Sequence, residues 1–195
     1  VNIPEDMKFF RTVTAGKTVI MGRRTLESFP GMKPLKGRVN IVMTGDPGRI
    51  KKESIAAADS FYIIDDTDKA ASESSVRAVC ESAFENAELT KNGAKASDKH
   101  TVLAVLMDKP SVLRLSEAIS KRLAETNECK EGTVRDECQN AISDDIFIIG
   151  GASIYSLFLP ECSSCLVTVN DSELEADMYF PRLDGMDDWE LSERG

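Results

Sequence analysis

Short apolar runs alternate with segments of helical spacing along most of the chain. We predict buried strands at residues 17–22, 38–44, 60–65, 146–149 and 165–170. We predict helices at residues 2–15, 23–29 and 153–159. Residues 101–107 fit either a strand or part of a helix, because periodicity alone does not separate the two in a short apolar run.

This alternation of strands and helices predicts an α/β fold with a mostly parallel sheet flanked by helices. The middle of the chain, residues 66–143, consists of long helical or polar tracts. No second domain of clear identity is visible, so we expect residues 1–195 to form a single domain.

Charge and hydropathy narrow the range of partners. The 195 residues include 33 acidic and 24 basic side chains, which gives a net charge of -9 and argues against nucleic-acid binding. A local basic pocket for an anionic ligand is still compatible with this charge. No apolar run approaches the roughly 20 residues that span a bilayer, and the first residues lack a secretory leader. We expect a cytoplasmic protein without a membrane partner.

The cysteines could indicate redox or zinc chemistry, because Cys162 and Cys165 form a C-x-x-C motif. The chain has no second such pair, and His100, its one histidine, is far away in sequence. Five cysteines in a chain without a leader are typical of reduced thiols in a cytoplasm. We therefore expect no metal site.

Two adjacent glycines, Gly150 and Gly151, lie between an apolar run and a segment of helical spacing. The N-terminus of a helix offers free N–H groups and a partial positive charge, and glycine lets a phosphate or a flat ring approach closely. A plain strand-to-helix turn explains the pair equally well, because neither G-x-G-x-x-G nor a P-loop lysine is present. Both interpretations stay open.

A second junction of this kind occurs at Gly22, which precedes Arg23, Arg24 and Thr25. The arginines could pair with phosphates. Alternatively, they could belong to a solvated turn in which Thr25 caps the helix. Two such junctions in one parallel sheet favour a dinucleotide at the carboxyl ends of the strands.

The third candidate is Asp6, which shares a helical face with Phe10 and lies beside Met7. An aspartate in the first turn could simply interact with the helix dipole. A carboxylate on an apolar face could instead be buried and receive two hydrogen bonds from a nitrogen heterocycle.

Five segments, in this order, resemble motifs of the dihydrofolate reductase family. They are "IPEDMKFFRTVT", "VIMGRRTLESF", "PLKGRVNIVMT", "IFIIGGASIYSLFLP" and "LVTVNDSELEADMYFP". Leu26 stands where the family usually has an aromatic residue.

The resemblance implies that 7,8-dihydrofolate is reduced to 5,6,7,8-tetrahydrofolate with NADPH, which feeds one-carbon and thymidylate metabolism. It implies that Asp6 binds the pteridine and assists protonation at N5, while Thr168 donates a hydrogen bond to that carboxylate. It also implies that Arg38 clamps the glutamate α-carboxylate, and that the peptide between Gly150 and Gly151 is cis. We expect a monomer and an antifolate target.

Further roles follow from the same resemblance. Substrate-binding roles are implied for Met7, Phe10, Ser28, Phe29, Leu35, Arg38 and Ile149. Cofactor-binding roles are implied for Gly22, Arg23, Arg24, Thr25, Met43, Thr44, Gly45, Ile149, Gly150, Gly151, Ala152, Ser153, Ile154 and Tyr155. Gly45 stands where the family often meets the 2′-phosphate with serine or arginine. Arg23, or the cluster of Arg49, Lys51 and Lys52, could compensate, so we expect NADPH over NADH.

The resemblance also has limits. The family has a strand and a tryptophan-bearing loop before the position of Val1 and a hairpin beyond Gly195, so we expect a larger protein or assembly with further segments. Residues 66–143 exceed the usual connection. We expect this insertion to emerge near the adenosine-binding part, away from the chemistry, so that its deletion leaves the rate nearly unchanged.

Three functional hypotheses are compatible with these observations. The first is an active reductase. The second is a protein that binds pterin and nucleotide without turnover. The third is a reductase-like domain whose insertion contacts other proteins.

Overall fold

The computed structural model describes residues 3–65, 67, 69–124, 146–169, 179–183, 185–187 and 189–192. The strands are β1 (Thr18–Gly22), β2 (Val39–Met43), β3 (Ser60–Ile64), β4 (Val102–Leu106) and β5 (Ile146–Gly150). The α-helices are α1 (Pro4–Val13), α2 (Arg23–Ser28), α3 (Lys52–Ala56), α4 (Lys69–Lys91), α5 (Lys109–Ala124) and α6 (Ala152–Phe158). Short 3-10 helices are η1 (Pro30–Met32), η2 (Pro47–Arg49), η3 (Ala96–Asp98) and η5 (Leu159–Glu161).

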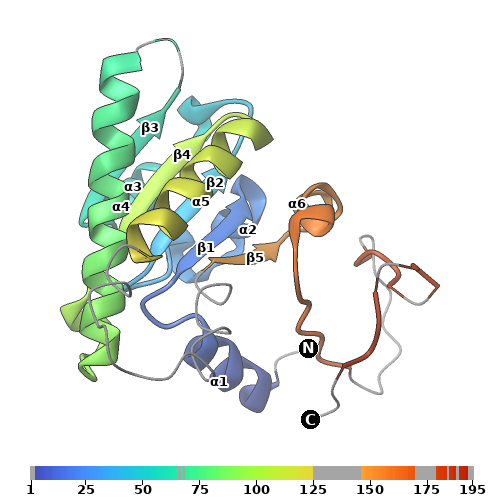
Figure 1. Cartoon of the computed structure of the whole chain (residues 1–195). Helices are drawn as coiled ribbons and strands as arrows, with labels where there is room; N and C mark the ends of the chain where they lie inside the picture. Colours follow the sequence, from blue (N-terminus) through green and yellow to red (C-terminus); the bar gives the residue numbers. More distant parts are fainter. Residues whose placement is uncertain are drawn as a thin grey trace.

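The strands form one five-stranded sheet in the order β3-β4-β2-β1-β5, and every neighbouring pair is parallel. The predicted α/β fold with a mostly parallel sheet flanked by helices is therefore confirmed. β1 lies between β2 and β5, so the carboxyl ends of these three strands lie together at one edge of the sheet. The helices that follow β1 and β5 begin at this edge (Figure 1).

Side chains alternate along the strands between two hydrophobic cores, as the pleat of a strand requires. Ile41 joins a core with residues of α4, α5 and α6, whereas Val42, its neighbour in β2, joins a core with Leu26 of α2. Figure 1 shows α4 and α5 side by side on one face of the sheet. Among the described helices, none combines the length and the apolarity that a bilayer-spanning segment requires.

The ambiguous residues 101–107 contain β4, which is buried at all five positions and pairs with β2 on one side and β3 on the other. Residues 66–143 thus supply an inner strand and, through α4 and α5, much of one core. This finding changes the expectation for their deletion. Removing them would expose both neighbouring strands and the core, so we expect loss of the fold.

The prediction of a strand at residues 165–170 is wrong for the described residues. Residues 165–169 have no strand assignment, and residue 170 lies outside the described part of the chain. Leu166, Val167 and Val169 are 63%, 56% and 87% exposed. An apolar run becomes a strand only where another strand can satisfy its backbone groups, and no described strand pairs with this one.

Candidate functional site

The two strand-to-helix junctions lie against one another. Gly22 is the N-cap of α2 and Gly151 is the N-cap of α6, and neither helix has a side-chain cap at its N-terminus. A Cβ added to Gly22 would lie 3.1 Å from Ile154 Cγ1, and one added to Gly151 would lie 3.5 Å from Thr25 Oγ1. Each glycine therefore faces the helix of the other junction. Uncapped N–H groups beside glycines suit an anionic ligand.

The peptide between Gly150 and Gly151 is cis, as the resemblance implies. Gly150 has a φ of +121°, and a Cβ there would lie 3.4 Å from the Tyr155 hydroxyl, so the first turn of α6 packs directly on this peptide. Burial and the nearby Cys165 raise the pKa of Tyr155, which keeps its hydroxyl protonated at neutral pH. The Tyr155 ring also meets Phe180 edge to face, with 4.9 Å between centroids.

The arginines of the first junction differ in their surroundings. Arg23 Nη1 donates to Glu27 Oε1 at 2.5 Å within α2, whereas Arg24 is exposed. The alternative in which Thr25 caps the helix is wrong, because Gly22 occupies that position. Thr25 instead directs its hydroxyl towards Gly151.

The other predicted cofactor residues lie at the same edge of the sheet. Met43 is paired in register with Gly22, and Thr44 follows it, with its N–H donated to Leu106 O at 3.0 Å. Gly45 is exposed, with no atom within 4 Å of the position of a Cβ. Ala152 and Ser153 form the first turn of α6. The structure thus brings the predicted cofactor residues to the ends of β1, β2 and β5.

Asp6 is hydrogen-bonded to Thr168, although the two residues are 162 positions apart. Thr168 Oγ1 donates to Asp6 Oδ1 at 2.5 Å. This is the hydrogen bond that the resemblance implies. Asp6 lies in the first turn of α1 and is partly buried, and Thr168 is exposed. The buried carboxylate considered from the sequence is therefore not observed, because Asp6 is only partly buried. The catalytic role of both residues stays a prediction.

The predicted apolar residues fall into two groups. Phe29, Leu35 and Ile149 pack on one core cluster, beside Val19 and Met21 of β1. The remaining predicted substrate residues are less enclosed: Met7 is 40% exposed, Phe10 is partly buried and Ser28 is exposed. The first group therefore forms a preformed apolar surface, whereas α1 presents its side chains more openly.

Arg38 is 7% exposed and is held by backbone carbonyls. Its Nε donates to Thr14 O at 2.8 Å, Nη1 to Lys36 O at 2.9 Å and Nη2 to Arg11 O at 3.0 Å. These bonds leave one N–H on each terminal nitrogen, which suits the two oxygens of a carboxylate. Burial and then Arg11 lower the pKa of Arg38, and an arginine stays charged at neutral pH all the same.

Sequence reasoning missed Asn40, which is fully buried in β2. Its side chain accepts a hydrogen bond from Leu35 N at 2.8 Å and donates to Leu35 O, Arg38 O and Val102 O. Asn40 therefore fixes the loop that carries two predicted substrate residues, Leu35 and Arg38. The sequence did contain a sign of this role, because Asn40 is a single amide inside an apolar run and a buried polar group requires hydrogen-bond partners.

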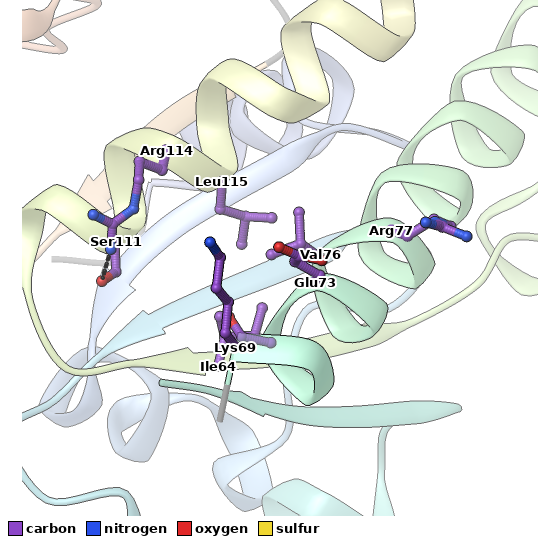
Figure 2. Close-up of a pocket in the computed structure, with 9 residues that line it drawn as sticks. Ile64, Lys69, Glu73, Val76, Arg77, Ser111, Arg114 and Leu115 are labelled. Atoms are coloured by element: carbon purple, nitrogen blue, oxygen red, sulfur yellow. Dashed lines mark hydrogen bonds between the residues drawn. The ribbon is translucent and has the colours of Figure 1, made fainter. Parts of the chain in front are cut away.

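A separate hollow of about 670 Å³ lies between the N-terminal parts of α4 and α5, beside Ile64 at the end of β3 (Figure 2). Lys69, Arg77 and Arg114 line it together with Glu73. Its lining includes none of the predicted site residues, and Figure 2 shows the Arg114–Ser111 hydrogen bond at its wall.

The C-x-x-C cysteines are free thiols. Cys162 Sγ donates to Phe158 O at 3.3 Å, and burial raises the pKa of both Cys162 and Cys165. A raised pKa lowers the thiolate fraction and with it the reactivity. Within the described ranges, no group of three or more metal-ligating side chains occurs.

Comparisons with known proteins agree with this arrangement. The family model for dihydrofolate reductase matches residues 1–79 and 112–195. A dihydrofolate reductase of Neisseria gonorrhoeae is 60% identical over 43 residues, which are 22% of this chain and 26% of that protein. A dihydrofolate reductase of Mycobacterium tuberculosis (strain H37Rv) is 49% identical over 43 residues, which are 22% of this chain and 27% of that protein.

A longer match is to a dihydrofolate reductase of Haemophilus influenzae, 25% identical over 190 residues, which cover 97% of this chain and 71% of that protein. The matches to the Neisseria and Mycobacterium proteins thus span about a quarter of each relative. Because the family model covers most of the chain on both sides of residues 80–111, the chain belongs to the dihydrofolate reductase family.

Proposed function

We propose that this protein reduces 7,8-dihydrofolate to 5,6,7,8-tetrahydrofolate with NADPH. The observation that carries the proposal is the Asp6 carboxylate, hydrogen-bonded by Thr168, in a chain of the dihydrofolate reductase family. Asp6 is the acid that the family motif places against the pteridine. With Thr168 on Oδ1, the second carboxylate oxygen is available to the substrate's amino group and ring nitrogen.

The cofactor fits the glycine-lined edge of the sheet. A Cβ at Gly22 would come within 3.1 Å of Ile154, so a side chain there would fill the space between the two junctions. Gly22, Thr25, Gly151 and the first turn of α6 would hold the phosphates, with Arg24 as the exposed cation. When bound, NADPH supplies the hydride for C6 of the substrate.

The protein's own residues then orient the substrate and exclude water. Phe29, Leu35 and Ile149 offer an apolar surface for the flat rings, and Arg38 takes a carboxylate with its two remaining N–H groups. Asp6 holds the pteridine and assists the protonation of N5. Orientation and one positioned proton are the means of catalysis available to these residues.

The test is an absorbance assay at 340 nm with dihydrofolate and NADPH. We expect Asp6→Asn to lower kcat by roughly 100-fold or more, because it removes the general acid–base group. The affinity for NADPH should change far less, since Thr168, the hydrogen-bond partner of Asp6, is not one of the residues assigned to NADPH.

Glu5→Gln is the matched control. Glu5 is exposed in the same first turn of α1, so it shares the helix-dipole interaction but not the hydrogen bond to Thr168. Equal losses of kcat in the two variants would contradict the role of Asp6. Binding of both ligands without turnover by the unaltered protein would instead support the hypothesis of binding alone.

A further inference from the structure

The loop before β4 places a buried lysine beside Arg38. Lys99 is 6% exposed, and it makes no hydrogen bond or ion pair within the part of the chain that the structure describes. The carboxylate of the neighbouring Asp98 is already bound by Lys95 N and by the Ser97 hydroxyl. Among the described residues, the Lys99 ammonium is not one of the fully buried side-chain atoms that lack a partner, so it keeps some contact with solvent.

The backbone around Lys99 is firmly held. Asn86 of α4 brackets the next residue, accepting from His100 N and donating to His100 O, both at 2.8 Å. Gly37 N donates to Thr101 Oγ1 at 2.9 Å, which fastens the loop to the residue that precedes Arg38. Lys99 is therefore set in place by α4 on one side and by the Arg38 loop on the other.

Two glycines leave space for the Lys99 side chain. A Cβ on Gly37 would lie 3.2 Å from Lys99 Cβ, and one on Gly16 would lie 3.1 Å from Lys99 Nζ. Both glycines have a positive φ, +67° and +74°, and larger residues would collide with the inserted segment. The Lys99 stem thus passes Gly37, and its ammonium reaches the turn whose Thr14 carbonyl binds Arg38.

Lys99, Arg38 and Arg11 form a cluster of like charge in a protein of net charge -9. Burial and then Arg38 lower the pKa of Lys99, and Asp98 offsets only part of this lowering. Burial and then Arg11 lower the pKa of Arg38. An anion between them would relieve this repulsion. Lys99 also lies within residues 80–111, which the family model does not match.

We propose that Lys99 binds the tail carboxylate that Arg38 leaves free, so that the protein holds both carboxylates of a glutamate-terminated pteridine. This inference rests on the proposed function. Arg38 takes one carboxylate through its paired N–H groups, and the compact Lys99 ammonium takes the other as a point charge. The inserted segment then selects substrates by the charge of their tail.

Equilibrium binding of three probes to the full chain tests the proposal: folate, its γ-amide and pteroate. The γ-amide keeps one tail carboxylate and neutralises the other, and pteroate lacks the glutamate. We expect Lys99→Met to weaken folate binding by roughly tenfold, the usual size of a lost charged hydrogen bond. The same variant should leave the affinities for the γ-amide and pteroate within about twofold, as a double-mutant cycle requires of a specific pair.

Lys91→Met is the matched control, because Lys91 is an exposed lysine of the same inserted segment and its ammonium pairs with Glu88 of its own helix at 2.8 Å. This variant should leave all three affinities unchanged. Urea unfolding without ligand should show that Lys99→Met is at least as stable as the parent, since it removes a positive charge that lies beside Arg38. A purely structural Lys99 would instead give lower stability with unchanged discrimination between probes.

The unaltered protein provides a test that does not depend on any variant folding. It should bind folate roughly tenfold more tightly than the γ-amide. Equal affinities, or no binding of any probe, would overturn the inference. Absence of turnover with dihydrofolate and NADPH would defeat the proposed function alone, because the Lys99-dependent preference for folate would still be measurable.

Discussion

β4 and β5 are both five-residue parallel strands made almost entirely of apolar residues, yet their surroundings differ. β4 pairs on both edges and is buried at every position. β5 pairs only with β1 among the described strands, and its first four residues are partly exposed. The helix after β4 has a side-chain cap from Asp108, whereas the helix after β5 has none.

This difference in burial suggests different contributions: β4 stabilises the fold, whereas β5 lies at the predicted site. Neighbouring strands pair with both edges of β4, its side chains are buried, and Asp108 caps the helix that follows it. β5 and α6 leave apolar side chains and N–H groups open at the edge where the site is expected. Ligand sites need such unsatisfied surface, and they are often less stable than the core for that reason.

The largest expected effect is the loss of stability when a core side chain of β4 is shortened. Leu103→Ala in β4 should lower the free energy of unfolding by about 3 kcal/mol, because Leu103 is fully buried and a cavity would remain. Ile149→Ala in β5 should cost less than about half of that, since Ile149 is already partly exposed. Urea denaturation measures both values. Equal losses would show that the two strands are equally packed.

A smaller effect concerns the amide that joins β2 to β4. Asn40→Ala should lower the free energy of unfolding by about 2 kcal/mol, because it leaves buried backbone groups of Leu35 and Val102 without their partner. It should also raise KM for dihydrofolate, since Leu35 and Arg38 lie on the loop that Asn40 holds. Asn92→Ala, at an exposed position, is the control and should change neither quantity.

The smallest effect sharpens the contrast between the two following helices. Ser111 N donates to Asp108 Oδ1 at 2.8 Å, and this bond, with the Ser111 hydroxyl, lowers the pKa of Asp108. Asp108→Ala should therefore cost about 1 kcal/mol at neutral pH. A lowered pKa means that this stabilisation is complete above the usual carboxyl value of about 3.9 and is lost as the pH falls through the lower folded value.

Asp108→Asn separates the cap from its charge. Asparagine caps a helix nearly as well, so most of the stability at neutral pH should remain, while the acid-dependent loss attributed to Asp108 should disappear. Thermal unfolding of the parent and both variants across the acidic range tests this. An unchanged pH profile in Asp108→Asn would assign the loss to other carboxylates.

The fold was largely predictable because apolar runs and helical spacing are local properties. The runs that contain β1, β2, β3 and β5 were each located to within a residue or two. The run at residues 165–170 failed for a non-local reason, since pairing depends on a neighbour that its own sequence does not contain.

The site was predictable in part. The motifs identified the two glycine junctions and the bond between Thr168 and Asp6. The pairing of Arg23 with Glu27 follows a helical spacing of four and was readable from the sequence. The contact of the inserted segment with Gly16 and Gly37 was not, because it depends on where α4 ends in space. The expectation that this segment emerges near the adenosine-binding part, away from the chemistry, stays a prediction, and Lys99 of this segment lies beside the Arg38 loop.

The order of strands in the sheet has a consequence for how the molecule folds. β1 meets β2 after a connection that contains only α2 and η1, but it meets β5 more than 120 positions later, and the partner of Asp6 lies 162 positions along the chain. Contacts between distant parts of a chain form slowly, because a long loop must close first. The sheet from β3 to β1 can therefore assemble early during synthesis, whereas the pairing of β5 with β1 forms later.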